Sequence, residues 1–191
     1  MIVASVLTGT FASAARSGRV ADAFRPALKQ LSKTKIPLLL PTEFGEVALD
    51  RPGPAIVAPG TIGADHYDVR IDITPGCFGD CACSAGRIFA GTEDYNNGLS
   101  EEYRVQEPVL EPGPRKPNPK ISPLPSLLDK RVRLAHGLTG YYSEYHEKEG
   151  GIAYLRFKQK NVIYDFSERL SSEAELVRIV NSAINNGPVK P

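Results

Sequence analysis

The sequence predicts an α+β fold: an antiparallel sheet with an N-terminal and a C-terminal helix packed on one face. Apolar residues recur at helical spacing near both ends of the chain and alternate with polar residues between them. Regular alternation of strands and helices is absent, which disfavours a parallel sheet. A length of 191 residues fits a single domain, expected over 19–187, with a long Pro-rich loop at 106–125.

The first residues, Met1 to Ala15, are apolar, and Ala12-Ser13-Ala14 has the small-x-small form of a signal-peptide cleavage site. No basic residue precedes Arg16, although signal peptides usually begin with one. Residues 1–18 are therefore expected to be a signal peptide or a disordered tail. We favour export, which predicts a periplasmic or extracellular protein.

Spacings of four, four and three between apolar residues predict a helix over 20–35, and basic residues occupy its other side: Arg19, Arg25, Lys29, Lys33 and Lys35. That side is either solvated, which we favour, or contacts anionic lipid or an acidic partner. The next segment, 36–41, has proline at both ends, which predicts an edge strand or an extended packed segment. Residues 45–65 show little periodicity and are predicted to form a surface loop.

Alternating apolar residues predict strands in the rest of the chain: His66–Ile73, Gly86–Gly91, Arg131–His136 and Thr139–Tyr145, followed by a hairpin of 152–158 and 162–167. Seven prolines between 106 and 125 exclude helix and central strand there and favour polyproline II. Ser172 and Glu175 form a capping-box pattern that begins the last helix, and Gly187-Pro188 ends it.

Charge and hydropathy exclude two classes of function. Basic and acidic residues number 23 and 22, so the basic surplus typical of proteins that bind nucleic acid is missing. No run of 18 apolar residues occurs, which predicts no transmembrane span, while peripheral membrane association remains open. A protein partner is expected, and no cofactor is predicted.

All three cysteines lie within one short segment, as Cys77, Cys81 and Cys83. A disulfide is favoured, with Cys77–Cys83 the easiest loop to close and the third thiol left over. The alternatives are a zinc site of the three cysteines with His66, in a small cytoplasmic thiol or zinc protein, and thiols without a special role. The spacing is unusual for zinc, which binds CxxC pairs far apart in sequence.

Catalysis is disfavoured because no GxSxG, HExxH or GKS/T motif occurs. A nucleophile–histidine–acid triad would have to use one of the cysteines, His66 or His136, and Asp68. The candidate binding residues are instead Tyr141, Tyr142 and Tyr145, because tyrosine suits surfaces that are apolar on one side and wet on the other. The alternative is ordinary strand tyrosines, with Tyr142 inward and Tyr141 outward.

Several spaced fragments, covering about two thirds of the chain, resemble a group of uncharacterised secreted bacterial proteins. They are 36–41, the cysteines Cys77 and Cys83, Gly140-Tyr141-Tyr142, Ala153-Tyr154-Leu155 and the helix at 175–184. The resemblance implies export and a Cys77–Cys83 pair, and it implies no activity. Together with the residues, it leads to the hypothesis of a non-catalytic accessory or binding domain outside the cytoplasm, such as a peripheral subunit of an envelope complex.

Overall fold

The computed structural model describes residues 17–44, 56–74, 77, 83–100, 105, 129–147, 150–169 and 171–189. In these residues one seven-stranded antiparallel sheet has the strand order β1-β2-β3-β7-β6-β5-β4. The elements are α1 (Ser17–Leu31), β1 (Ile56–Ile62), β2 (His66–Asp72), β3 (Ser84–Thr92), α3 (Glu93–Gly98), β4 (Lys130–Arg133), β5 (Thr139–Glu147), β6 (Gly150–Gln159), β7 (Val162–Arg169) and α4 (Glu173–Asn186).

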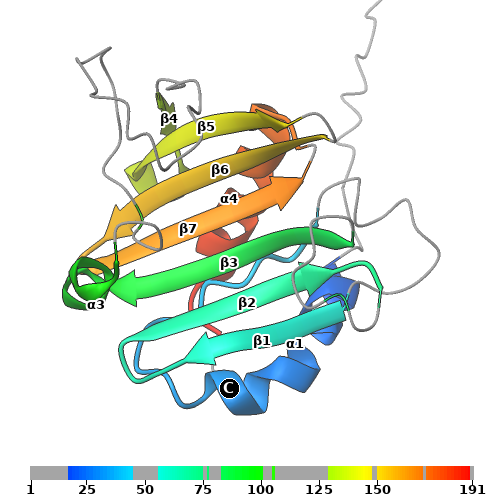
Figure 1. Cartoon of the computed structure of the whole chain (residues 1–191), viewed down its shortest axis with the longest axis vertical. Coiled ribbons are helices and arrows are strands. Elements are labelled where there is room, and N and C mark those ends of the chain that lie inside the picture. Colours follow the sequence, from blue (N-terminus) through cyan, green and yellow to red (C-terminus); the bar gives the residue numbers. More distant parts are fainter. Residues whose placement is uncertain are drawn as a thin grey trace, which may run out of the picture.

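Helices α1 and α4 both lie behind the sheet in Figure 1, on the same face. The predicted α+β class, with two terminal helices on one face of an antiparallel sheet, is therefore confirmed. We call the face toward these helices the inner face and the opposite one the outer face. The predicted Pro-rich loop at 106–125 falls outside the described residues.

The inner face carries the core. Alternate residues of each strand point toward the helices, and the hairpin of β6 and β7 contributes Leu155, Phe157, Tyr164 and Phe166, all almost completely buried. A row across this face runs from Tyr67 in β2 through Ala90 in β3 to Tyr164 in β7. The extended segment 36–41 packs against the same core and contacts the end of the chain through a bridge between Leu38 and Val189.

Two elements were not expected from the sequence. Strand β1 lies where a surface loop was predicted; Pro59 and Gly60 interrupt its alternation, and a register shift follows Pro59. Proline is tolerated there because β1 is an edge strand and Pro59 needs no partner for an N–H. The short helix α3 begins where the Thr92 side chain accepts a hydrogen bond from the backbone N–H of Tyr95.

The predicted strands and the last helix are confirmed, with small differences in their ends. Ser172 Oγ accepts a hydrogen bond from the Glu175 N–H at 3.3 Å, and Gly187 ends α4 with a φ of 72°. Helix α1 begins and ends earlier than predicted and contains Pro26. Strands β3 and β7, distant in sequence, pair over seven residues, so that β3, β7 and β6 form the centre of the sheet.

Candidate functional site

A row of charged and aromatic residues crosses the outer face at its centre. Directly paired positions on six neighbouring strands form this row: Asp68, Phe89, Asp165, Arg156, Tyr141 and Arg131. We call it the transverse row. Because paired residues of an antiparallel sheet point to the same side, these side chains share the face opposite α1 and α4. A second row beside it contains Arg70, Arg87, Ser167, Tyr154 and Ser143.

Two arginines connect the rows to carboxylates. Arg87 Nε donates to Asp68 Oδ1 at 2.7 Å, and its guanidinium lies over the Phe89 ring, 5.4 Å from the centroid. Arg156 Nη2 donates to Asp129 Oδ1 at 2.8 Å and to Ser143 Oγ at 3.0 Å. The Arg156 pair is the more buried of the two, since only 5% of the Asp129 side chain is exposed. This pair therefore fixes the residue that precedes β4.

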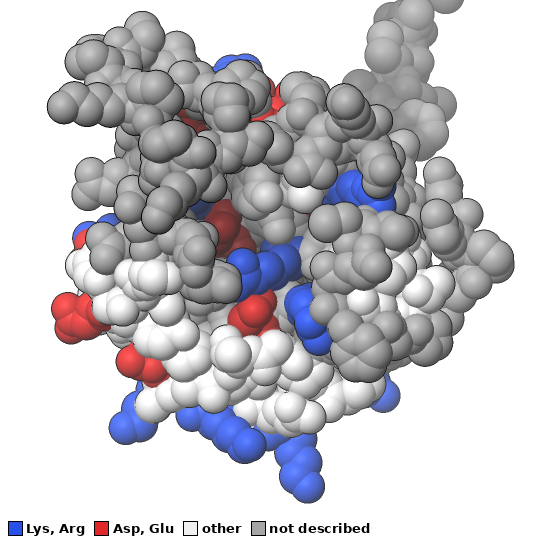
Figure 2. Space-filling view, in the orientation of Figure 1, with Lys and Arg blue, Asp and Glu red and all other residues white. Residues whose placement is uncertain are grey.

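Asp165 lies between these arginines, in the central strand β7. Its Oδ1 atom is buried and has no hydrogen-bond partner among the described residues. Burial raises the pKa of Asp165 to about 6, while Arg156 and Arg87 act to lower that pKa and Asp129 acts to raise it. A carboxylate in this position has unused capacity to accept a hydrogen bond. Figure 2 shows acidic and basic side chains gathered together near the centre of this face.

The three predicted tyrosines do not form one patch. Tyr142 belongs to the inner face, where 6% of it is exposed and its hydroxyl donates to Glu144 at 2.6 Å. Burial, and next the hydrogen bond to Glu144, raise the pKa of Tyr142. This burial leaves no surface for a partner, so the binding assignment of Tyr142 is corrected. Tyr141 lies in the transverse row, opposite Arg156, and the side chain of Tyr145 lies outside the described part.

The cysteine segment forms the disulfide that the sequence analysis favoured. Cys77 and Cys83 are bonded, with their Cα atoms 5.6 Å apart, and Cys77 is buried. The Ile73 N–H donates to the Cys83 carbonyl, so the disulfide closes the connection between β2 and β3. Cys81 falls outside the described residues.

His66 lies far from this disulfide. It begins β2, whereas the disulfide follows the other end of the strand, so a rise of about 3.3 Å per residue separates them by roughly 20 Å. The alternative zinc set of three cysteines and His66 is thus not brought together. Within the described ranges, no group of three or more His, Cys, Asp or Glu side chains is arranged to hold a metal.

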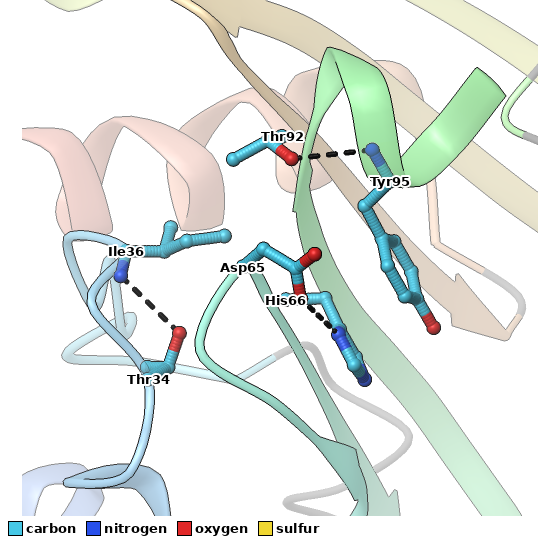
Figure 3. Close-up of polar contacts among 6 residues, drawn as sticks. All are labelled: Thr34, Ile36, Asp65, His66, Thr92 and Tyr95. Carbon is cyan, nitrogen blue, oxygen red and sulfur yellow. Dashed lines mark hydrogen bonds and ion pairs between the residues drawn. The ribbon is translucent and has the colours of Figure 1, made fainter. Parts of the chain in front are cut away.

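The triad that catalysis would have required is not assembled among the described residues either. His66 Nδ1 bonds Asp65 Oδ1 at 2.9 Å, and its ring stacks on Tyr95 of α3 with centroids 3.8 Å apart (Figure 3). The hydrogen bond with His66 lowers the pKa of Asp65. Asp68, the expected acid, pairs with Arg87 instead. The other candidate, His136, is exposed in a turn with a φ of 55°. The stacked rings of His66 and Tyr95 therefore join β2 to α3.

Sequence reasoning missed Arg87, Arg156 and Asp165. Arg156 and Asp165 lie between apolar neighbours in a strand, and Arg87 lies between Gly86 and Ile88; such patterns predict strands and do not by themselves mark a binding site. A sharper signal was present, because charged residues in the middle of long strands are unusual when the strands are central to a sheet. This signal can be used only when it is known which strands are central, and the sequence alone does not give the strand order.

No helix among the described residues is both long and apolar enough to cross a membrane. Comparison with known proteins finds no matching family model, curated protein or solved structure.

Proposed function

We propose that this protein is a non-catalytic binding domain that works outside the cytoplasm and takes a protein partner on the outer face of its sheet. The transverse row is the observation that carries this proposal. It places arginine, tyrosine and aspartate side by side on a broad surface that no described helix covers.

The residue types of the two rows suit a protein interface. Arginine and tyrosine are enriched among residues that dominate binding energy, because each combines apolar area with directional hydrogen bonding. Arg87 is half exposed and already oriented by Asp68 and Phe89, so little entropy is lost when it binds a carboxylate. Tyr141 adds an aromatic surface beside Arg156.

Asp165 suggests the chemistry of the partner. A lysine, arginine or amide N–H of the partner would supply the hydrogen bond that Asp165 Oδ1 lacks once the side chain turns outward on binding, because Oδ1 is buried in the unbound protein. We therefore expect a partner segment with a hydrogen-bond donor opposite Asp165 and a carboxylate near Arg87. Electrostatic complementarity of this kind gives specificity more than affinity.

The compartment is supported by two features. Disulfides such as Cys77–Cys83 persist in oxidising compartments and are rare in the cytosol. The apolar stretch from Met1 to Ala15 resembles a signal peptide. The intact mass of the protein from its native host tests export: a chain cut near Ala14 with one alkylatable cysteine is expected, and an uncut chain with three thiols would contradict it.

Differential capture tests the binding site. The purified domain is cross-linked to envelope proteins of the native host, and the captured proteins are compared between variants. Arg87→Ala and Tyr141→Ala are expected to lose one protein that the unchanged domain captures. Arg178→Ala is the matched control, because Arg178 is also 50% exposed and paired with a carboxylate, Glu43, but belongs to α4.

Capture that survives both outer-face substitutions would reject the site, and equal loss in Arg178→Ala would show that the effect is not specific to this face. The donor hypothesis is tested separately by NMR titration with short peptides of matched length that carry arginine, aspartate or neither. Shifts in β7 and β6 are expected with the arginine peptide. Equal shifts with all three peptides would reject a donor opposite Asp165.

A further inference from the structure

The outer side of α1 and the turn after it carry only basic charges among the described side chains. Phe24, Ala27 and Leu31 are buried, which turns the other side of the helix away from the sheet. We call the exposed basic side chains there the basic rim: Arg25, Lys29, Lys33 and Lys35. Figure 2 shows basic side chains projecting from the lower border of the molecule, where Figure 1 places α1 and β1.

The lysines of the basic rim differ from the lysines of the strands in their ion pairs. Lys130 pairs with Glu173 at 2.7 Å, and Lys158 pairs with Glu93. No carboxylate lies within ion-pair distance of Lys29, Lys33 or Lys35 in the part of the chain that the structure describes.

One acidic residue lies beside the rim. The Lys35 N–H donates to the Ala64 carbonyl, which brings the next residue, Asp65, close, but Asp65 is bonded to His66. The one acidic residue of α1 itself is Asp22, whose side chain lies outside the described part. The positive charges of Lys29, Lys33 and Lys35 are thus compensated little by their described neighbours.

We propose that the basic rim docks the protein on a membrane surface that contains anionic phospholipids. Lysine ammonium groups on flexible stems suit a fluid layer of headgroups, whereas a fixed anion is usually held by arginine forks. Three lysines on one side of the molecule, without an ion-pair partner among the described residues, therefore fit a lipid surface better than a single fixed anion.

Membrane docking through the rim would leave the transverse row free. Helix α1 packs behind the sheet, on the face opposite to Arg156 and Tyr141. The inference is therefore independent of the proposed partner site, and both contacts can be made at once.

Vesicle co-sedimentation of the full chain tests the proposal, with vesicles of equal parts phosphatidylglycerol and phosphatidylcholine and vesicles of phosphatidylcholine alone. Binding is expected to the anionic vesicles and to fall steeply with salt. Each lysine near such a surface contributes a factor of roughly five to the partition constant. The triple variant Lys29→Gln, Lys33→Gln, Lys35→Gln is therefore expected to bind roughly a hundredfold more weakly.

The matched control is Arg133→Gln, Lys158→Gln, Lys160→Gln, which removes the same charge at three exposed positions away from α1 and outside the transverse row. This variant is expected to bind like the unchanged chain, and circular dichroism verifies that both variants fold. An equal loss in the control would show that net charge, and not the rim, governs binding, which overturns the proposal.

Two further outcomes would overturn the membrane assignment. Equal binding to phosphatidylcholine vesicles would assign it to the apolar N-terminal stretch. Binding of soluble polyphosphate as tight, per phosphate, as binding of the anionic vesicles would identify an acidic polymer as the ligand. Arg87→Ala separates the two proposals, because it is expected to leave vesicle binding unchanged while partner capture is lost.

Discussion

The buried hydroxyls of Tyr67 and Tyr164 hold the same extended segment against the sheet. Tyr67 accepts a hydrogen bond from the Leu39 N–H at 3.2 Å, and Tyr164 donates to the Pro37 carbonyl at 3.1 Å. Both tyrosines are paired in the sheet with Ala90, whose small side chain leaves room between the two rings. Two backbone groups of the segment 36–41 thus have hydrogen-bond partners in side chains of β2 and β7.

Replacing Tyr67 by phenylalanine is expected to lower the free energy of unfolding by about 1–3 kcal/mol. The substitution leaves the Leu39 N–H without a partner, and Leu39 is only 2% exposed. Urea denaturation measures the change. Tyr95→Phe is the control, since it keeps the ring that stacks on His66, and it is expected to stay within about 0.5 kcal/mol. Equal effects of the two substitutions would contradict this role of Tyr67.

Asp165→Asn is expected to change how stability depends on pH. Folding raises the pKa of Asp165 from 3.8 to about 6, so the folded state binds the proton more tightly than the unfolded state. The stability contributed by protonated Asp165 is fully present below the pKa of the unfolded state, 3.8, and is lost as pH rises through the pKa of the folded state, about 6. Relative to the variant, the unchanged chain should lose up to about 3 kcal/mol across this interval. A difference that stays constant with pH would contradict the prediction.

Gly86→Ala is expected to destabilise the protein by about 1–3 kcal/mol. A Cβ at Gly86 would lie 2.4 Å from the Ser167 carbonyl oxygen, so the backbone of β3 or β7 would have to move. Gly98→Ala is the matched control, because no atom lies within 4 Å of its Cβ position. This control should be neutral or stabilising by up to about 1 kcal/mol, since alanine favours the helix. Thermal melting of both variants checks the pair.

Removal of the disulfide by Cys77→Ser with Cys83→Ser is expected to cost about 2 kcal/mol, because the bond closes a short loop. The two cysteines are separated by six positions, so little entropy of the unfolded chain is at stake. Reductant should lower the melting temperature of the unchanged chain to that of the variant. It should leave the melting temperature of the variant unchanged. An unchanged melting temperature after verified reduction would mean that the loop is held by other contacts.

The local elements of this fold could be predicted from the sequence because their signals are local. Ser172 and Gly187 delimit α4 through their own backbone and side-chain chemistry. The hairpin turn at 159–161 also sets the register that places Asp165 opposite Arg156. This pair of the transverse row was therefore within reach of sequence reasoning.

The positions of Phe89 and Asp68 in the row depend on the pairing of β3 with β7. That contact brings Phe89 next to Asp165 across more than seventy positions of sequence, and no local pattern specifies it. Strand β1 was missed for a different reason. Pro59 and Gly60 are turn residues in most contexts, and only the position of β1 at the border of the sheet makes them acceptable.

The two border strands bear on how the protein behaves at high concentration. Pro59 removes one donor from β1, and the register shift beside it distorts the strand. At the other border, β4 is only four residues long and three of them are exposed cations, Lys130, Arg131 and Arg133. A second chain that tried to extend the sheet would meet a missing hydrogen bond at one border and charge repulsion at the other. Both borders are thus protected against amyloid-like stacking, and contact with other molecules is directed to the broad faces.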